Sequence, residues 1–214
     1  MVKVMRFCVC GAACLPGMPP QAVTAKDVLT AVRRKHAKDA VVREVVVDDP
    51  FHQAILNRWR LTGSSAEYWE SRIDPAEVAP SIPDGWTPVD AVPQRRIDAL
   101  IVTSRMLTAV EIKVTRADFR RDTDEKRRAW QLFSHRFVYA VPKGLVTPDE
   151  VPASCGLWEF DPELFDPRRP KQHGLTTTKK AVMNRAPAPL PDQVFISLAH
   201  RVSRYETKEE RRAA

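Results

Sequence analysis

Two acidic residues and a lysine stand in the two most apolar segments of the chain. Asp98 lies in the run Arg-Ile-Asp-Ala-Leu-Ile-Val-Thr, and Glu111 and Lys113 lie in the run Leu-Thr-Ala-Val-Glu-Ile-Lys-Val-Thr. Both runs are rich in aliphatic and β-branched residues, which is typical of strands buried in a sheet. An ionised group in such a strand costs on the order of several kcal/mol unless it is paired or bound to metal. These three residues are therefore the first candidates for a functional site.

The spacing of the three residues predicts that their side chains meet. Side chains at i and i+2 of a strand share a face, so Glu111 and Lys113 project together. A two-residue turn at Ser104 and Arg105 would place Asp98 directly across from Glu111, with Cβ atoms about 5 Å apart. A four-residue loop would instead place Asp98 across from Lys113. Either register gathers the three groups at one place.

These residue types suit hydrolysis of a phosphodiester with the help of a metal ion. Carboxylates, a backbone carbonyl and water form a set of hard oxygen ligands that Mg²⁺ or Mn²⁺ prefers. An ion held there would bind the phosphate, activate a water and stabilise the charge at phosphorus. Lys113 would position or deprotonate that water, or neutralise the transition state. We therefore expect catalytic roles for Asp98, Glu111 and Lys113, and for Glu44 on the preceding expected strand. The expected metal ligands are the carboxylates of Asp98, Glu111 and Glu44 and the backbone carbonyl of Ile112.

The same pattern has a purely structural interpretation. The sequence Glu-x-Lys occurs by chance about once in a few hundred residues. A buried ion pair between Lys113 and one of the two carboxylates would also account for the charged groups in these strands.

Periodicity and capping signals predict a mixed α/β sandwich, with a mixed β-sheet flanked by helices. Thr24 is a candidate N-cap for the first helix. The expected helices span 24–38, 51–61, 66–73, 122–134 and 192–204, and the expected strands span 41–47, 96–103, 107–115, 137–141 and 156–160.

The length of 214 residues fits one domain with additions. We expect a flexible leader at 1–22, a core over 23–206 and a tail at 207–214. Residues 48–90, with eight acidic and three basic residues, are expected to form an acidic, mostly helical insertion that offers a surface to a protein partner. No apolar run reaches the roughly 20 residues of a membrane span, so we expect no membrane association and a cytoplasmic location.

Three of the four cysteines, Cys8, Cys10 and Cys14, lie close together in the leader. With Cys155 they would be able to hold zinc or an iron–sulfur cluster. Their spacing matches no common zinc pattern, however, and no histidine stands nearby, so we expect no such site.

Basic residues follow the candidate site. Residues 113–136 contain eight basic and four acidic residues, and such a stretch is either a solvated helix face or a contact surface for phosphates. The second interpretation predicts DNA binding by Arg116, Arg120, Arg121, Lys126, Arg127 and Arg128.

The string Arg-Ile-Asp-Ala-Leu, followed by Glu-Ile-Lys-Val-Thr-Arg-Ala-Asp-Phe-Arg-Arg-Asp at 111–122, then Lys126 and Phe-Val-Tyr-Ala-Val-Pro at 137–142, resembles a known family. It is similar to the PD-(D/E)XK nuclease superfamily, and more narrowly to the MmcB-like DNA repair proteins. The resemblance covers about residues 24–47 and 95–206. It implies a restriction endonuclease-like fold, and it assigns the family's acidic and lysine positions to Asp98, Glu111, Lys113 and, upstream, Glu44. Asp118 and Lys126 match further positions.

The chain departs from this family in four places, one of which is a slightly longer spacing between Phe119 and Lys126. Ile97 stands where the superfamily has its proline, and the insertion at 48–90 and the cysteine-containing leader have no counterpart. The function expected from the resemblance is Mg²⁺- or Mn²⁺-dependent cleavage of DNA, in repair or nucleic-acid processing. The alternatives are a DNA-binding module without catalysis, and an interaction protein that uses the acidic insertion.

Overall fold

A computed structural model describes residues 22–62 and 91–201. Residues 192–201 are helical, and the remaining elements, in chain order, are α1 (Ala25–Lys35), β1 (Ala40–Asp48), α2 (Pro50–Thr62), β2 (Gln94–Val102), β3 (Leu107–Ile112), α4 (Arg116–Arg120), α5 (Asp124–Phe133), β4 (Arg136–Pro142), β5 (Gly156–Phe165) and β6 (His173–Lys179). The expected α/β class is confirmed.

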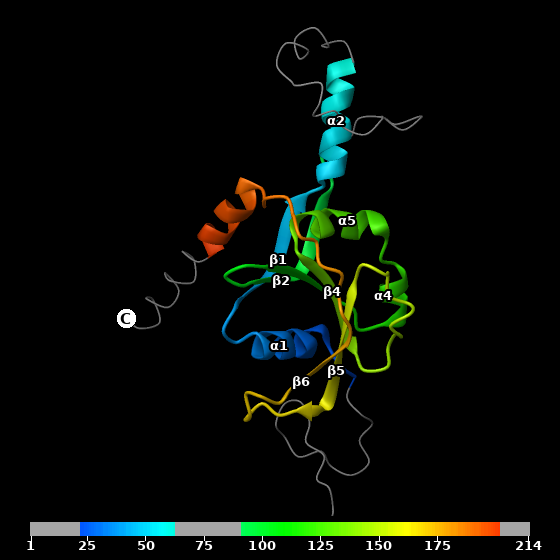
Figure 1. The fold of residues 1–214 in the computed structure, drawn as a ribbon, viewed down its shortest axis with the longest axis vertical. Coiled ribbons are helices and arrows are strands. Elements are labelled where there is room, and N and C mark those ends of the chain that lie inside the picture. Colours follow the sequence, from blue (N-terminus) through cyan, green and yellow to red (C-terminus); the bar gives the residue numbers. More distant parts are fainter. Residues whose placement is uncertain (1–21, 63–90, 202–214) are drawn as a thin grey trace, which may run out of the picture. The chain divides into compact units, whose positions relative to one another are not determined.

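The strands form one mixed sheet in the order β1-β2-β3-β4-β5-β6 (Figure 1). The pairs β2–β3 and β5–β6 are antiparallel, whereas β3–β4 and β4–β5 are parallel. A parallel pair needs a crossover connection, and α4 and α5 provide it between β3 and β4. This crossover begins directly after the candidate site residues.

Helix α1 covers one face of the sheet. It begins with a capping box, in which the Asp27 backbone N–H donates to Thr24 Oγ1 at 3.3 Å and the Thr24 backbone N–H donates to Asp27 Oδ2 at 2.9 Å. Its residues Val28, Ala31 and Val32 are fully buried in one apolar cluster with residues of β2 to β6. The helix ends at Lys35, three residues earlier than expected.

Helix α5 contacts β3 and β4, and its Trp130 and Phe133 are buried. Val110 and Ile112 of β3 belong to the cluster under α1. Because side chains alternate along a strand, Glu111 points to the other face of the sheet. The candidate site therefore lies on the face away from α1.

The crossover differs from the expectation in detail. The strand expected at 107–115 ends at Ile112, because Thr115 begins a short helix, α4, that the periodicity did not reveal. The hydroxyl of Thr115 accepts a hydrogen bond from the Asp118 backbone N–H at 3.1 Å. Asp118 is thus a first-turn residue of α4, and the N-cap of the following helix is Thr123.

Strand β6 is not among the strands expected from the sequence. The helix at 192–201 confirms the last predicted helix, and its Phe195 is 55% exposed. The helix expected at 51–61 is confirmed as α2. The helix expected at 66–73, residues 1–21 of the leader and the tail lie outside the described residues.

The chain divides into two compact units. One comprises residues up to Val45 together with Ile97–Pro189, and the other comprises Val46–Arg96 and Leu190 onward. In the second unit, Asp49 is fully buried and pairs with Arg95, with 2.7 Å between Arg95 Nη2 and Asp49 Oδ2. All residues of the candidate site lie in the first unit, which is described by itself below.

Candidate active site

The hairpin of β2 and β3 brings Asp98 and Glu111 together. Its turn is the two-residue form, with the Thr103 backbone N–H donating to the Met106 carbonyl at 3.0 Å. The pairing of Ala99 with Val110 confirms the register expected for that turn, in which Asp98 and Glu111 come next. Asp98 Oδ2 accepts a hydrogen bond from the Ile112 backbone N–H at 2.7 Å. One carboxylate oxygen of Asp98 is therefore fixed against the strand that carries Glu111.

Glu111 and Lys113 project to the same face, as their spacing predicts. Lys113 Nζ lies 2.8 Å from Glu111 Oε1, and only 10% and 15% of the two side chains are exposed. The same nitrogen lies 3.7 Å from Asp118 Oδ2 in α4. The Lys113 backbone N–H donates to the Ala140 carbonyl at 3.1 Å, which carries the pairing with β4 one residue past the end of β3.

The two charged partners are held in opposite electrostatic situations. Burial, followed by the charge of Asp98, raises the pKa of Glu111 to about 7, against the opposing effect of Lys113. Burial alone would lower the pKa of Lys113. The hydrogen bond and charge of Glu111 and the charges of Asp118 and Asp122 nevertheless raise it above its usual value. Lys113 is accordingly a lysine that stays cationic, while Glu111 carries a charge that a further cation would stabilise.

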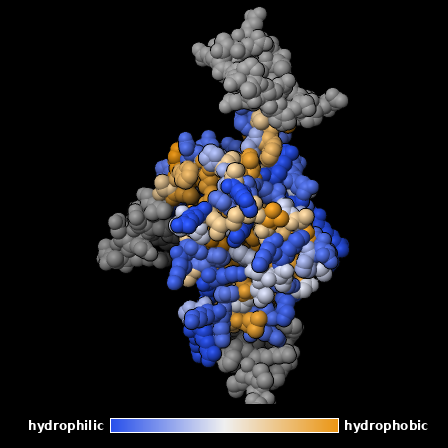
Figure 2. All heavy atoms as spheres, in the orientation of Figure 1, coloured by the Kyte–Doolittle hydropathy of each residue, from blue (hydrophilic) through white to orange (hydrophobic). Residues whose placement is uncertain are grey.

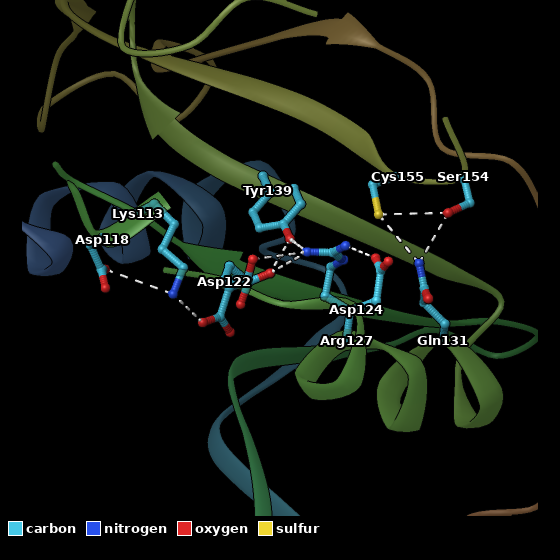
Figure 3. A network of polar contacts seen from close by, with 10 residues as sticks. Lys113, Asp118, Asp122, Asp124, Arg127, Gln131, Tyr139, Ser154 and Cys155 are labelled. Atoms are coloured by element: carbon cyan, nitrogen blue, oxygen red, sulfur yellow. Dashed lines mark hydrogen bonds and ion pairs between the residues drawn. The ribbon is translucent and has the colours of Figure 1, made fainter. Parts of the chain in front are cut away.

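A second polar network lies beside this group (Figure 3). Tyr139 is the β4 partner of Glu111 in the parallel register. Its hydroxyl donates to Asp122, which also accepts from Arg127 Nη1 at 3.0 Å. The Tyr139 side chain is almost fully buried, and burial followed by the hydrogen bond to Asp122 raises the pKa of its phenol above the usual range. The charge of Asp122 acts on both Glu111 and Lys113.

Sequence reasoning gave Asp122 and Tyr139 no role. Asp122 lies at the expected start of a helix, where a capping role explains an acid well. Tyr139 comes beside Glu111 through the parallel pairing of β3 with β4, so only the register of that pair would have revealed its role. That register cannot be read from hydrophobic alternation, because β4 is buried on both faces.

The expected DNA-binding residues do not form one free basic face. Arg127, one of the residues expected to contact phosphate, is buried and pairs with Asp122 and Asp124. Arg116 is exposed but pairs with Glu150 and donates to the Leu145 carbonyl at 2.9 Å. The remaining members are Arg121, which lies 3.8 Å from Asp118, the half-buried Arg128, and the exposed Arg120 and Lys126.

Glu44 is not brought into the group. It is exposed in β1 and has a φ of 47°, in the left-handed region that non-glycine residues rarely adopt. In residues 22–62 and 91–201, no three His, Cys, Asp or Glu side chains are placed to hold a metal ion. The expected four-ligand set reduces to Asp98 and Glu111, with the carbonyl of Ile112 as a backbone candidate.

Cys155 is a free, fully buried cysteine before β5. The Gln131 side-chain amide lies 3.3 Å from its Sγ, and burial raises the pKa of its thiol. The other three cysteines lie outside the described residues.

The chain matches no family model and no curated protein. A solved structure resembles part of it: the SPO1766 protein of unknown function from Silicibacter pomeroyi, at 22% identity and a TM-score of 0.39, with 53% of this chain and 73% of that chain covered. A likeness of this strength supports no argument about the site. Across the described part of the chain, none of the helices has the length and apolar character needed to cross a bilayer.

Proposed function

We propose that this protein is a Mg²⁺- or Mn²⁺-dependent deoxyribonuclease with Asp98, Glu111 and Lys113 as its active site. The observation that carries the proposal is the convergence of two carboxylates and a lysine on one face of the β2–β3 hairpin. The two carboxylates fit a divalent cation, because burial and the charge of Asp98 disfavour ionisation of Glu111 unless positive charge is supplied. Such an ion, when bound, would supply Lewis-acid stabilisation of a phosphate and an acidified water.

The protein's own groups divide the remaining work. Asp98 is oriented by the Ile112 backbone N–H, so its second oxygen has a fixed direction. Lys113 acts as a cation that orients or neutralises phosphate oxygens, because its neighbours raise its pKa and disfavour a neutral amine. Among the roles that the sequence left open for Lys113, the raised pKa favours charge neutralisation over deprotonation of the water. Tyr139, Asp122 and Arg127 would hold the β3–β4 side of the site in place.

The test is incubation with single-stranded, duplex and branched DNA, with Mn²⁺ and with a chelator. We expect cleavage of at least one form only with Mn²⁺, and loss of that cleavage in Glu111→Gln. Asp149→Asn is the matched control, because Asp149 is an exposed acid and its loss changes the net charge equally. A wild type that cuts none of the three forms would refute the proposal.

The sequence offered two rivals, and the same samples separate them. A DNA-binding module would bind DNA equally well with and without Mn²⁺ and leave it intact. An interaction protein without a metal site would show no change in melting temperature when Mn²⁺ is added.

A further inference from the structure

Two segments on the α1 side of the sheet are strongly basic. Residues 33–39 contain four arginines or lysines and one acid, and residues 166–173 contain three and one. The first segment is the last turn of α1 with the residues that follow it, and the second is the connection from β5 to β6. In Figure 2 the lower part of the surface, near this connection, shows hydrophilic residues beside a smaller hydrophobic patch.

Direct contacts join the two segments into one surface. Arg34 Nη2 donates to the Pro167 carbonyl at 2.8 Å, and its guanidinium lies 5.4 Å from the centre of the Phe165 ring. Lys35 Nζ donates to Thr177 Oγ1 at 3.2 Å and lies 4.4 Å from the Trp158 ring centre. The end of α1 is therefore packed against β5, β6 and the loop between them.

Next to these residues in the chain are basic residues whose side chains pair with no carboxylate in the described part of the chain. Arg33 precedes Arg34, and Arg168 follows Pro167. Both are exposed, and within the described ranges neither side chain makes an ion pair or hydrogen bond. Exposed Lys38 and Lys171 are in the same situation. The acid of the loop, Asp166, is engaged by Arg169 at 3.5 Å. We call Arg33, Lys38, Arg168 and Lys171 the α1–β6 basic surface.

The electrostatics of the neighbouring bases agree with this geometry. Burial lowers the pKa of His173, and the charges of Lys35 and His36 lower it further. Basic groups of α1 and β6 thus lie within reach of each other's field. A polyanion bound at this place would relieve their mutual repulsion.

We propose that the α1–β6 basic surface binds the phosphate backbone of nucleic acid, and that it is a contact separate from the carboxylate site. The choice of nucleic acid as the polyanion rests on the proposed function, whereas the surface itself does not. α1 lies on the sheet face opposite Glu111. The contact would therefore hold the nucleic acid at a place away from the point of cleavage. A membrane suits the surface less well, because Trp158 and Phe165 lie under Lys35 and Arg34 and are not free to insert into lipid.

The test measures binding to duplex and single-stranded DNA at several salt concentrations in the presence of a chelator, so that cleavage does not enter. Removing two phosphate contacts with Arg33→Ala and Arg168→Ala together should flatten the plot of log affinity against log salt by about two units. The control pair is Lys26→Ala and Arg105→Ala. Lys26 is exposed at the other end of α1 and Arg105 in the β2–β3 turn, so the control loses the same charge and should keep the wild-type slope.

Each outcome decides the matter. An unchanged slope in the Arg33 and Arg168 double variant, with an unchanged melting temperature, would overturn the inference, as would equal flattening in both pairs. Binding to vesicles rich in phosphatidylserine without binding to DNA would identify a membrane surface instead. If the wild type cuts DNA and the slope does not change, this inference fails and the proposed function stands. If the slope flattens but no DNA form is cut, the basic surface stands as a nucleic-acid contact and the proposed function fails.

Discussion

The two faces of the central sheet treat charge differently. Around Glu111 the charged groups are largely buried and form ion pairs: Lys113 pairs with Glu111, and Arg127 pairs with Asp122. On the α1 side, Arg34 and Lys35 lie over aromatic rings. The neighbouring Arg33 and Arg168 are exposed to solvent and pair with no acidic residue in the described part of the chain. Charges that are preorganised and shielded from water suit chemistry at a fixed point, whereas exposed cations suit a mobile polyanion. Net charge along the sequence does not separate these two uses.

The largest difference should come from changing the carboxylate–lysine group. Lys113→Ala should still bind Mn²⁺ but lose cleavage by on the order of two to three powers of ten, because no cation remains to meet the phosphate oxygens. Glu111→Gln should weaken Mn²⁺ binding and leave the free energy of unfolding unchanged or slightly higher, since it removes repulsion from Asp98. Manganese titration, a cleavage assay and calorimetric melting of both variants provide the measurement.

The structural interpretation of the same residues forecasts the reverse. If the group is only a buried ion pair, removing either partner strands a charge and costs about 3–5 kcal/mol of stability. Two badly destabilised variants, from a wild type that neither binds manganese nor cuts DNA, would establish that interpretation.

The next difference concerns two arginines of opposite burial. Arg127→Ala leaves the buried Asp122 without its cation, so we expect a loss of about 3–5 kcal/mol in the free energy of unfolding. Arg33→Ala removes an exposed side chain and should change it by less than about 0.5 kcal/mol. Urea denaturation of both variants measures the contrast, and similar values for the two would show that Arg127 is not a buried ion-pair partner of Asp122.

The pH dependence of stability should distinguish the Glu111 side. Because the folded protein raises the pKa of Glu111 to about 7 from 4.5, the folded state binds the proton more tightly than the unfolded state. The metal-free wild type should therefore gain stability relative to Glu111→Gln as the pH falls from about 7.5 to 4.5, by at most about 3 kcal/mol. Parallel unfolding curves at several pH values in chelator test this. A stability difference between the two proteins that is constant over this range would contradict the shifted pKa.

The smallest effect should follow from loosening the helix that carries the α1–β6 basic surface. Thr24→Ala removes the capping hydroxyl of α1 and should cost about 1 kcal/mol. Cleavage of short DNA should stay at the wild-type rate, because α1 contacts the opposite face of the sheet from Glu111. Thr24→Ser, which keeps the hydroxyl, is the control. A large loss of cleavage in Thr24→Ala alone would mean that the two faces are coupled.

Much of the fold and part of the candidate site followed from local patterns. The apolar runs containing Asp98 and Glu111, the Thr24 cap and the two-residue turn at Ser104 and Arg105 are short-range features, and the structure has each of them. The i, i+2 spacing was sufficient to place Glu111 beside Lys113, because strand geometry leaves little choice over two residues.

Other features required the tertiary structure, because they depend on which distant segments pack together. The pairing of β3 with β4 sets Tyr139 beside Glu111 and brings Asp122 and Arg127 to its hydroxyl, which turns a basic helix residue into a buried partner. The end of α1 meets the β5–β6 connection across more than 130 residues of chain, so its exposed cations gain neighbours that no local pattern contains. Sequence alone determined the residue types that can do chemistry here. Only the packing of distant segments decided which charged side chains form ion pairs inside the protein and which stay exposed to solvent, where a binding partner is able to reach them.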